Sequence, residues 1–272
     1  MIYISYWLSV GDYAPTAVMA SATLVFGLLS SVVAARRLFF LAGAAPHASL
    51  LAALLAVPTA LAVGTSFTVL TGLIGILLVY AVGYAIYRGV DEDIATSLFV
   101  SATASLSVIL AYLVATRYSL GFDITALVFG DPLLAGREEA LSSALVAALV
   151  ATTLLATYRR QVYIGVDREA AQLAGLRVWF YDWLFFTMLG LGISVLIRSV
   201  GFVLEHVLVL IPGAIAGYAS SSREALLYAT ASSCIAGALG LWASRLLNVA
   251  PAGATGLVLL ALYVLALTLT RE

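Results

Sequence analysis

The feature that most constrains the fold of this chain is a series of apolar stretches, each about 20 residues long, separated by short polar connections. A helix of about 20 apolar residues spans the hydrocarbon core of a bilayer and satisfies its own backbone hydrogen bonds there, which an open strand cannot do. The sequence therefore predicts an all-α, polytopic integral membrane protein. The predicted spans are 14–35, 47–66, 67–87, 96–116, 138–157, 179–197, 199–219, 225–245 and 253–270. These are nine spans, or eight if the chain does not divide at Thr65 and Ser66 or at Arg198.

Composition agrees with this fold class and excludes several functions. Of the 272 residues, 63% are hydrophobic and 10% are charged, whereas soluble domains carry roughly a quarter charged residues. The net charge of -1 gives no basic surface for nucleic acid. The single cysteine, Cys234, excludes an intrachain disulfide and a cysteine-based metal cluster. With no long hydrophilic segment, residues 1–272 are expected to form a single transmembrane domain in the plasma membrane.

Arginine placement predicts the orientation, because basic residues are retained in short cytosolic loops. All thirteen basic residues are Arg, and an extracellular N-terminus leaves four of them outside, at 117, 137, 198 and 245. The other nine then lie inside, at 36, 37, 88, 159, 160, 168, 177, 223 and 271. The polar connection 158–178 is therefore expected to be cytosolic.

This inner connection contains Glu169, Ala170, Ala171 and Gly175. The run E-A-A-x-x-x-G resembles the coupling motif of ABC importer permeases, a short helix that docks in a cleft on an ATPase subunit. Small Ala side chains allow close approach, the acid offers a charge-assisted contact, and Gly permits a sharp turn. The alternative interpretation is an ordinary amphipathic loop helix.

Further motifs extend the resemblance over nearly the whole chain. The chain resembles the metal-ion family of ABC transporter permeases, the zinc and manganese importers, in five motifs that occur in the same order. The first two are an Arg-Arg pair before a stretch with a His, and an acidic second inner turn. The others are a Phe-Gly-Asp segment, a Gly and a Pro eleven residues apart, and a Pro-x-Gly sequence before the last span. The residues are Arg36, Arg37, His47, Glu92, Asp93, Ala95, Phe129, Gly130, Asp131, Gly201, Pro212, Pro251 and Gly253.

The resemblance implies the membrane-spanning permease subunit of an ATP-driven importer of a divalent metal, zinc or manganese, with iron also open. It further implies a permease homodimer or a closely related heterodimer, a cytosolic ATPase and an extracellular metal-binding lipoprotein. The chain carries no Walker motif, so it is not expected to be an enzyme. No resident cofactor is expected, because the metal ion is the transported substrate. A polytopic membrane scaffold without translocation activity is the alternative function.

Four residues are candidates for contact with the metal ion: His47, Glu205, His206 and Asp131. The family's pattern places an Asp four residues before the His, on the same helix face, but this chain has Gly43 there. Glu205 and His206 lie in an apolar span, where ionisable residues are costly and suggest a pathway or ligand role.

Each candidate has a structural alternative. Glu205 could pair with Arg198, or Glu205 and His206 could have a proton-coupled or gating role. His47 could be a plain interfacial residue, and Asp131 could cap a short helix before Pro132. Since His47 begins a predicted span on the cytosolic side and Glu205 lies roughly 10 Å below the outer surface, the two regions are expected to be successive stations rather than one site. Asp182 is interpreted as an N-terminal helix charge.

Overall fold

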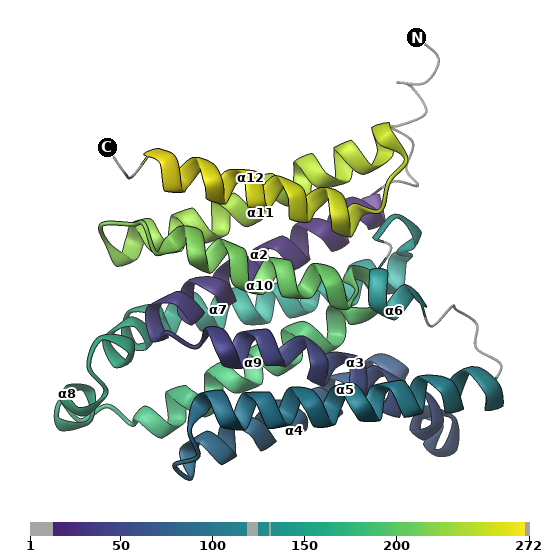
Figure 1. Ribbon diagram of the computed structural model, residues 1–272, viewed down its shortest axis with the longest axis horizontal. Coiled ribbons are helices and arrows are strands. Elements are labelled where there is room, and N and C mark those ends of the chain that lie inside the picture. The colour runs from purple at the N-terminus through teal and green to yellow at the C-terminus, as the bar shows by residue number, and fades with distance from the viewer. Residues whose placement is uncertain (1–12, 119–124, 131, 270–272) are drawn as a thin grey trace.

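The structure is a computed structural model that describes residues 13–118, 125–130 and 132–269 (Figure 1). Every regular element within these residues is a helix. The elements are α2 (Tyr13–Arg36), α3 (Phe39–Val63), α4 (Phe67–Tyr87), α5 (Glu92–Arg117), α6 (Thr125–Phe129), the 3₁₀ turn η2 (Pro132–Leu134), α7 (Arg137–Val166), α8 (Arg168–Leu173), α9 (Val178–Val200), α10 (Phe202–Ala216), α11 (Ser222–Leu247) and α12 (Pro251–Leu269).

The long helices run back and forth along the long axis of the molecule (Figure 1). Eight of the described helices are long and apolar enough to cross a membrane: α2, α3, α4, α5, α7, α9, α11 and α12. α10 is also apolar but has 15 residues, which is about 22 Å of helix. The all-α, multi-pass prediction is confirmed.

Both of the uncertain divisions in the sequence are real breaks between helices. Gly64 ends α3 in the left-handed conformation, with φ +70°, and α4 begins at Phe67 after two further residues. Gly201, with φ +80°, separates α9 from α10. A positive φ is a conformation that glycine adopts at little cost. α10 runs back against the direction of α9 (Figure 1). The described residues thus hold eight helices long enough to cross a membrane, with α10 as a shorter apolar helix beside them.

α2 is the central helix of the bundle and packs most extensively against α7, α11 and α10. Its side chains Val25, Phe26 and Leu29 are fully buried. Close contact with α11 depends on Gly27, where a Cβ would lie 2.9 Å from Thr230 Cα. α3 is the second buried helix and lies against α4, α5 and α9, whereas α5 and α12 are mostly exposed.

Two helices, α3 and α7, extend well beyond the predicted spans. α3 begins at Phe39, eight residues before the predicted start at 47, and it contains Pro46 and Pro58. Proline is tolerated inside membrane helices because neighbouring groups satisfy the freed carbonyls, so Pro46 does not mark a helix start. α10 also has an internal proline, Pro212. α7 continues to Val166, beyond the predicted boundary at 157.

The two ends of the bundle carry different connections (Figure 1). The left end in the figure, here called the α8 end, holds α8 and the turns that follow α2, α4 and α10. The opposite end, here called the α6 end, holds α6 and the turns that follow α3, α9 and α11. Of the arginines predicted to be cytosolic, Arg37 and Arg88 lie in turns at the α8 end, and Arg223 lies in the first turn of α11 at the same end.

Candidate functional site

Two helices bring both histidines of the chain together. His47 on α3 and His206 on α10 have ring centroids 5.3 Å apart, with planes at 87°. The ring of Phe202 packs against both, at 4.9 Å from His47 and 4.4 Å from His206. Both imidazoles are half-buried. The expectation that these residues form successive stations is therefore wrong.

The predicted separation of His47 from Glu205 and His206 was wrong because the predicted boundaries of α3 and α10 were wrong. Because α3 starts at Phe39, His47 lies about 12 Å along the helix axis from its N-terminus, and not at the N-terminus itself. α10 is short and starts at Phe202, so its first two turns reach the same depth from the other direction. The predicted spans placed the two segments at opposite surfaces, whereas the structure places them side by side.

Glu205 directly precedes His206 on α10. Its side chain is fully buried on α10, and Ser49 Oγ on α3 lies 2.6 Å from Glu205 Oε2. Ser49 Oγ also lies 2.8 Å from the carbonyl oxygen of Pro46. Glu205 Oε1 has no hydrogen-bond partner among the described residues. A buried carboxylate oxygen without a partner is costly.

The alternative ion pair between Glu205 and Arg198 does not form. Arg198 lies on α9, where its Nη1 is 3.4 Å from Glu139 Oε1 on α7. The reversal at Gly201 places Glu205 on a different helix, so the two residues do not share a face two turns apart. The residue that contacts Glu205, Ser49, was not predicted. It could have been found as a hydroxyl two residues after His47 in an otherwise apolar run.

The spacing of the two imidazoles suits a shared metal ion. Two imidazoles bound to one tetrahedral ion have ring centres about 5 Å apart, because metal–nitrogen distances are about 2.0–2.1 Å. His206 Nδ1 lies 3.0 Å from the Phe202 carbonyl oxygen, and the imidazole also interacts with the backbone of Gly43. As placed, however, no three His, Cys, Asp or Glu side chains of the described chain are arranged to hold a metal ion together.

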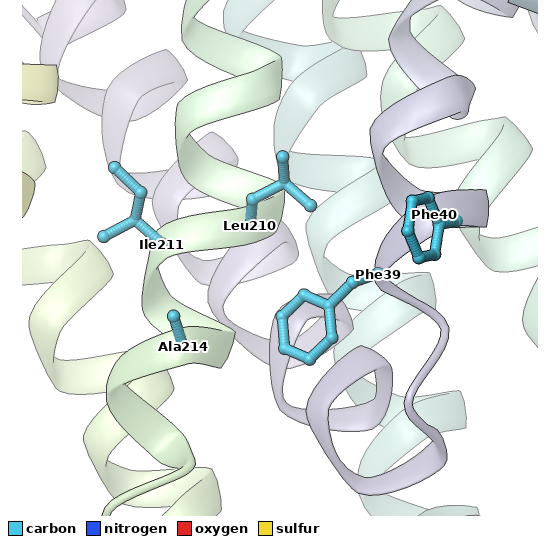
Figure 2. Close-up of a pocket in the computed structure, with 5 residues that line it drawn as sticks. All are labelled: Phe39, Phe40, Leu210, Ile211 and Ala214. Atoms are coloured by element: carbon cyan, nitrogen blue, oxygen red, sulfur yellow. The ribbon is translucent and has the colours of Figure 1, made fainter. Parts of the chain in front are cut away.

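The cluster opens sideways into a groove between α3, α5 and α10. This groove, of about 560 Å³, is lined by His47, Gly43, Thr96, Ser97 and Ser101 together with apolar side chains. A neighbouring apolar groove of about 320 Å³ continues towards the α8 end; Figure 2 shows Phe39 and Phe40 of α3 facing Leu210, Ile211 and Ala214 of α10 across it. Asp131, the remaining metal candidate, lies outside the described residues.

The predicted coupling segment forms a separate short helix, α8, at the α8 end. Asp167 caps it by accepting a hydrogen bond from Ala170 N at 2.9 Å. Ala171 is fully buried, whereas Glu169 is exposed. Gly175 has φ +83° and ends the helix, with Leu176 N bonded to the Ala171 carbonyl at 3.0 Å. The glycine-dependent turn predicted at Gly175 is present.

A buried charge cluster that the sequence did not reveal anchors α8 to the bundle. Asp182 on α9 pairs with Arg36 at the end of α2 and with Arg168 of α8, whose Nη2 lies 2.5 Å from Asp182 Oδ2. Arg36 Nη1 also donates to Gln161 Oε1 at 2.9 Å. Asp182 is thus the hub of interactions among α2, α8 and α9. It lies in the second turn of α9, so its interpretation as an N-terminal helix charge is wrong.

Three comparisons with known proteins agree with this architecture. The chain is 26% identical over 241 residues to the "Probable metal transport system membrane protein" of Treponema pallidum (strain Nichols), covering 87% of this chain and 86% of the relative. It is 24% identical over 245 residues to the "Manganese transport system membrane protein MntC" of Halalkalibacterium halodurans, covering 89% and 82%. The solved structure of PsaBC from Streptococcus pneumoniae in complex with Fab superposes with a TM-score of 0.80 at 20% identity, over 93% of this chain and 90% of that one.

The family assignment rests on the match to a whole-family description. Residues 13–270 match the ABC 3 transport family, and this range includes every helix described above. The eight apolar helices fit a protein embedded in the membrane over its length. The chain therefore belongs to the ABC 3 transport family and is a multi-pass permease of the plasma membrane.

Proposed function

We propose that this chain is the permease subunit of an ATP-driven importer of a divalent metal ion. The observation that carries the proposal is the contact between His47 and His206 inside the bundle, with the buried Glu205 directly before His206 on α10. Two imidazoles and a carboxylate, deep among apolar helices, are the ligand types that bind zinc, manganese and iron. The printed names of the two sequence relatives, a metal transport protein and a manganese transport protein, support the same class of substrate.

In this proposal each residue of the cluster has a distinct role. His47 and His206 supply neutral imidazole nitrogens, and Glu205 supplies a carboxylate oxygen through Oε1, which has no other partner among the described residues. Ser49 holds the other carboxylate oxygen and so orients Glu205. Asp131, which lies outside the described residues, is assigned to meet the ion on entry from outside.

A second copy of the permease completes the pathway. One copy alone does not place three ligands from its described residues around an ion, and His47 faces the groove between α3, α5 and α10. Ser97, Ser101 and Ser105 lie exposed at four-residue spacing on α5 beside this groove. Exposed hydroxyls and a half-buried imidazole suit an ion path between two copies better than a surface covered by lipid tails. A homodimer with this face inward is therefore part of the proposal.

ATP hydrolysis is assigned to a separate cytosolic subunit that docks on α8. Glu169 offers a charge-assisted contact, and Gly175 forms the turn that ends the helix. Ala170 and Ala171 have small side chains that allow the ATPase to approach the helix closely. Leu173, which is 90% exposed, provides the apolar anchor. An extracellular metal-binding lipoprotein delivers the ion at the α6 end.

The test is metal-stimulated ATP hydrolysis by the permease, its ATPase and its binding protein reconstituted in liposomes. Zinc, manganese and iron are compared over a range of concentrations. His47→Ala, His206→Ala and Glu205→Gln should each raise the metal concentration needed for half stimulation by roughly tenfold to a hundredfold. Arg198→Gln, which removes a partly exposed pair with Glu139, should leave it unchanged.

The competing scaffold function makes the opposite prediction. A scaffold would support no metal-dependent hydrolysis and no metal uptake in the wild-type complex. If the wild type responds to metal and the three cluster variants respond equally well, transport holds and the assignment of ligands fails.

A further inference from the structure

A second groove lies on another face of the bundle, between α7 and α11. Both helices pack on α2, and they leave between them a groove of about 370 Å³ near the α8 end, lined by Leu155, Tyr158, Arg159, Arg223 and Leu227 among others. Tyr158 closes it by donating a hydrogen bond to the Ser222 carbonyl oxygen at 2.9 Å. None of these residues contributes to the histidine cluster or to α8.

The two arginines occupy matching positions on the two helices. Arg159 lies two residues beyond the predicted span 138–157, inside α7, and Arg223 lies two residues before the predicted span 225–245, in the first turn of α11. Both are exposed, and neither takes part in any of the three ion pairs formed by described residues. Glu224, the acid next to Arg223, accepts a hydrogen bond from Ser220 N at 2.9 Å. The groove therefore presents two positive charges at the boundary of the apolar core.

One helical turn deeper, each wall presents an exposed leucine. Leu155 precedes Arg159 by four residues on α7, and Leu227 follows Arg223 by four residues on α11, so each leucine shares a face with its arginine. These leucines are 55% and 64% exposed. From the rim inward the groove thus offers two guanidinium groups and then an apolar surface, which is the order of groups in a phospholipid.

We propose that this groove binds an anionic phospholipid from the leaflet at the α8 end. Arg159 and Arg223 bind the headgroup phosphate, because guanidinium groups form paired hydrogen bonds to phosphate oxygens. Leu155 and Leu227 contact the start of an acyl chain. Basic pockets between transmembrane helices are a known mode of headgroup binding, and the lipid links α7 and α11 where they do not pack on each other.

The test measures lipid bound to the purified full-length permease in detergent by native mass spectrometry. After delipidation the protein is titrated with phosphatidylglycerol or with phosphatidylcholine. The Arg159→Gln, Arg223→Gln double variant is compared with Arg160→Gln, a matched control. Arg160 has the same charge and lies on the same helix, but its guanidinium packs on Tyr181 at 5.9 Å instead of lining the groove. Gel filtration confirms that each variant is monodisperse.

The wild type and Arg160→Gln should prefer phosphatidylglycerol and retain it equally. Each groove arginine removed should weaken its binding about fivefold, and Arg159→Lys with Arg223→Lys should restore part of the preference. Equal binding of both lipids by the wild type, or equal loss in Arg160→Gln, overturns the proposal.

Two further experiments distinguish a phospholipid from other negatively charged ligands. Inorganic phosphate should not displace bound phosphatidylglycerol, since it lacks the chain that contacts the leucines; displacement at equal concentration overturns the lipid assignment. The arginines could instead contact the ATPase subunit. If the double variant loses a tagged ATPase in a pull-down but retains phosphatidylglycerol like the wild type, the groove is a protein contact and the proposal is wrong.

Discussion

Gly43 lies one helical turn before His47, at the position where the permeases that the chain resembles carry an aspartate. The structure leaves room for a side chain there, because a Cβ at 43 would have Leu210 Cδ1 as its nearest neighbour, at 3.8 Å. The missing carboxylate is thus not excluded by packing. Glu205 on α10, which contacts Ser49 of α3, is the acid proposed to act in its place.

Gly43→Asp should therefore strengthen the response to metal. A carboxylate at this position lies on the same face of α3 as His47 and adds a hard oxygen ligand to the two imidazoles. The metal concentration for half-maximal ATP hydrolysis should fall, and the fall should be largest for manganese, which prefers oxygen ligands. Gly43→Asn has nearly the same size and no charge, so it serves as the control. An identical shift in both variants would show that helix packing, not the carboxylate, is responsible.

At the scale of single residues, the sequence revealed which side chains are unusual but not which ones meet. His47, Glu205 and His206 stand out because ionisable groups are rare in apolar spans. Their proximity could not be predicted, since it depends on where α3 and α10 begin. Pro46 suggested a helix start, yet it lies inside α3. The contacts of Ser49 and Asp182 were not predictable either, because their partners come from helices far apart in the chain.

At the scale of elements, α8 depends on the conformation of Gly175. Its φ of +83° is unfavourable for a β-branched residue and acceptable for Asn. Gly175→Val should strain the turn by about 1–3 kcal/mol and lower ATPase docking, measured by pull-down of the ATPase, while the permease keeps its unfolding temperature. No atom outside the chain's immediate neighbours lies within 4 Å of a Cβ at this position, so any effect arises from the backbone.

Gly175→Asn is the matched control and should retain docking. A Gly175→Val variant that binds the ATPase and transports at the wild-type rate would remove the coupling role from this turn.

The anchor of α8 can be tested through the Asp182 hub. Asp182→Asn leaves the buried guanidinium of Arg36 with Gln161 as its remaining neutral partner, and removing one member of a buried ion pair costs about 3–5 kcal/mol. Arg168, with a side chain 48% exposed, contributes much less, so Arg168→Ala should cost under about 1 kcal/mol. Thermal unfolding in detergent measures both. Equal losses would mean that Arg168, and not Arg36, is the main partner of the aspartate.

At the scale of the whole molecule, the order of the apolar helices was predictable from hydropathy, whereas eight of the nine predicted spans are long enough to cross a membrane among the described residues. α10, the remaining apolar helix, is the short one. The boundaries were less predictable, because a helix such as α7 continues through polar residues as far as Val166 when its end packs on other elements. The orientation in the membrane stays a prediction based on the arginines.

Cysteine labelling tests that orientation. Cys234 is the single cysteine of the chain, so a Cys234→Ala background gives an unlabelled starting point. Arg168→Cys at the α8 end and Gly136→Cys at the α6 end are both exposed positions. A membrane-impermeant maleimide added to intact cells should label position 136 only, with position 168 labelled after lysis. Labelling of 168 in intact cells would invert the protein and remove the docking argument.

The six prolines of the chain have an uneven distribution among its described helices. The three that lie beyond the first turn of a helix are Pro46 and Pro58 of α3 and Pro212 of α10, and these two helices carry the histidine cluster. Each internal proline removes one main-chain hydrogen bond of the helix. A helix that lacks such a hydrogen bond bends more readily at that point. α3 and α10 are therefore the least stiff members of a bundle whose central helix, α2, has no such interruption along its buried length. Bending of α3 at Pro46 changes the distance between His47 and His206 while the ends of both helices stay fixed.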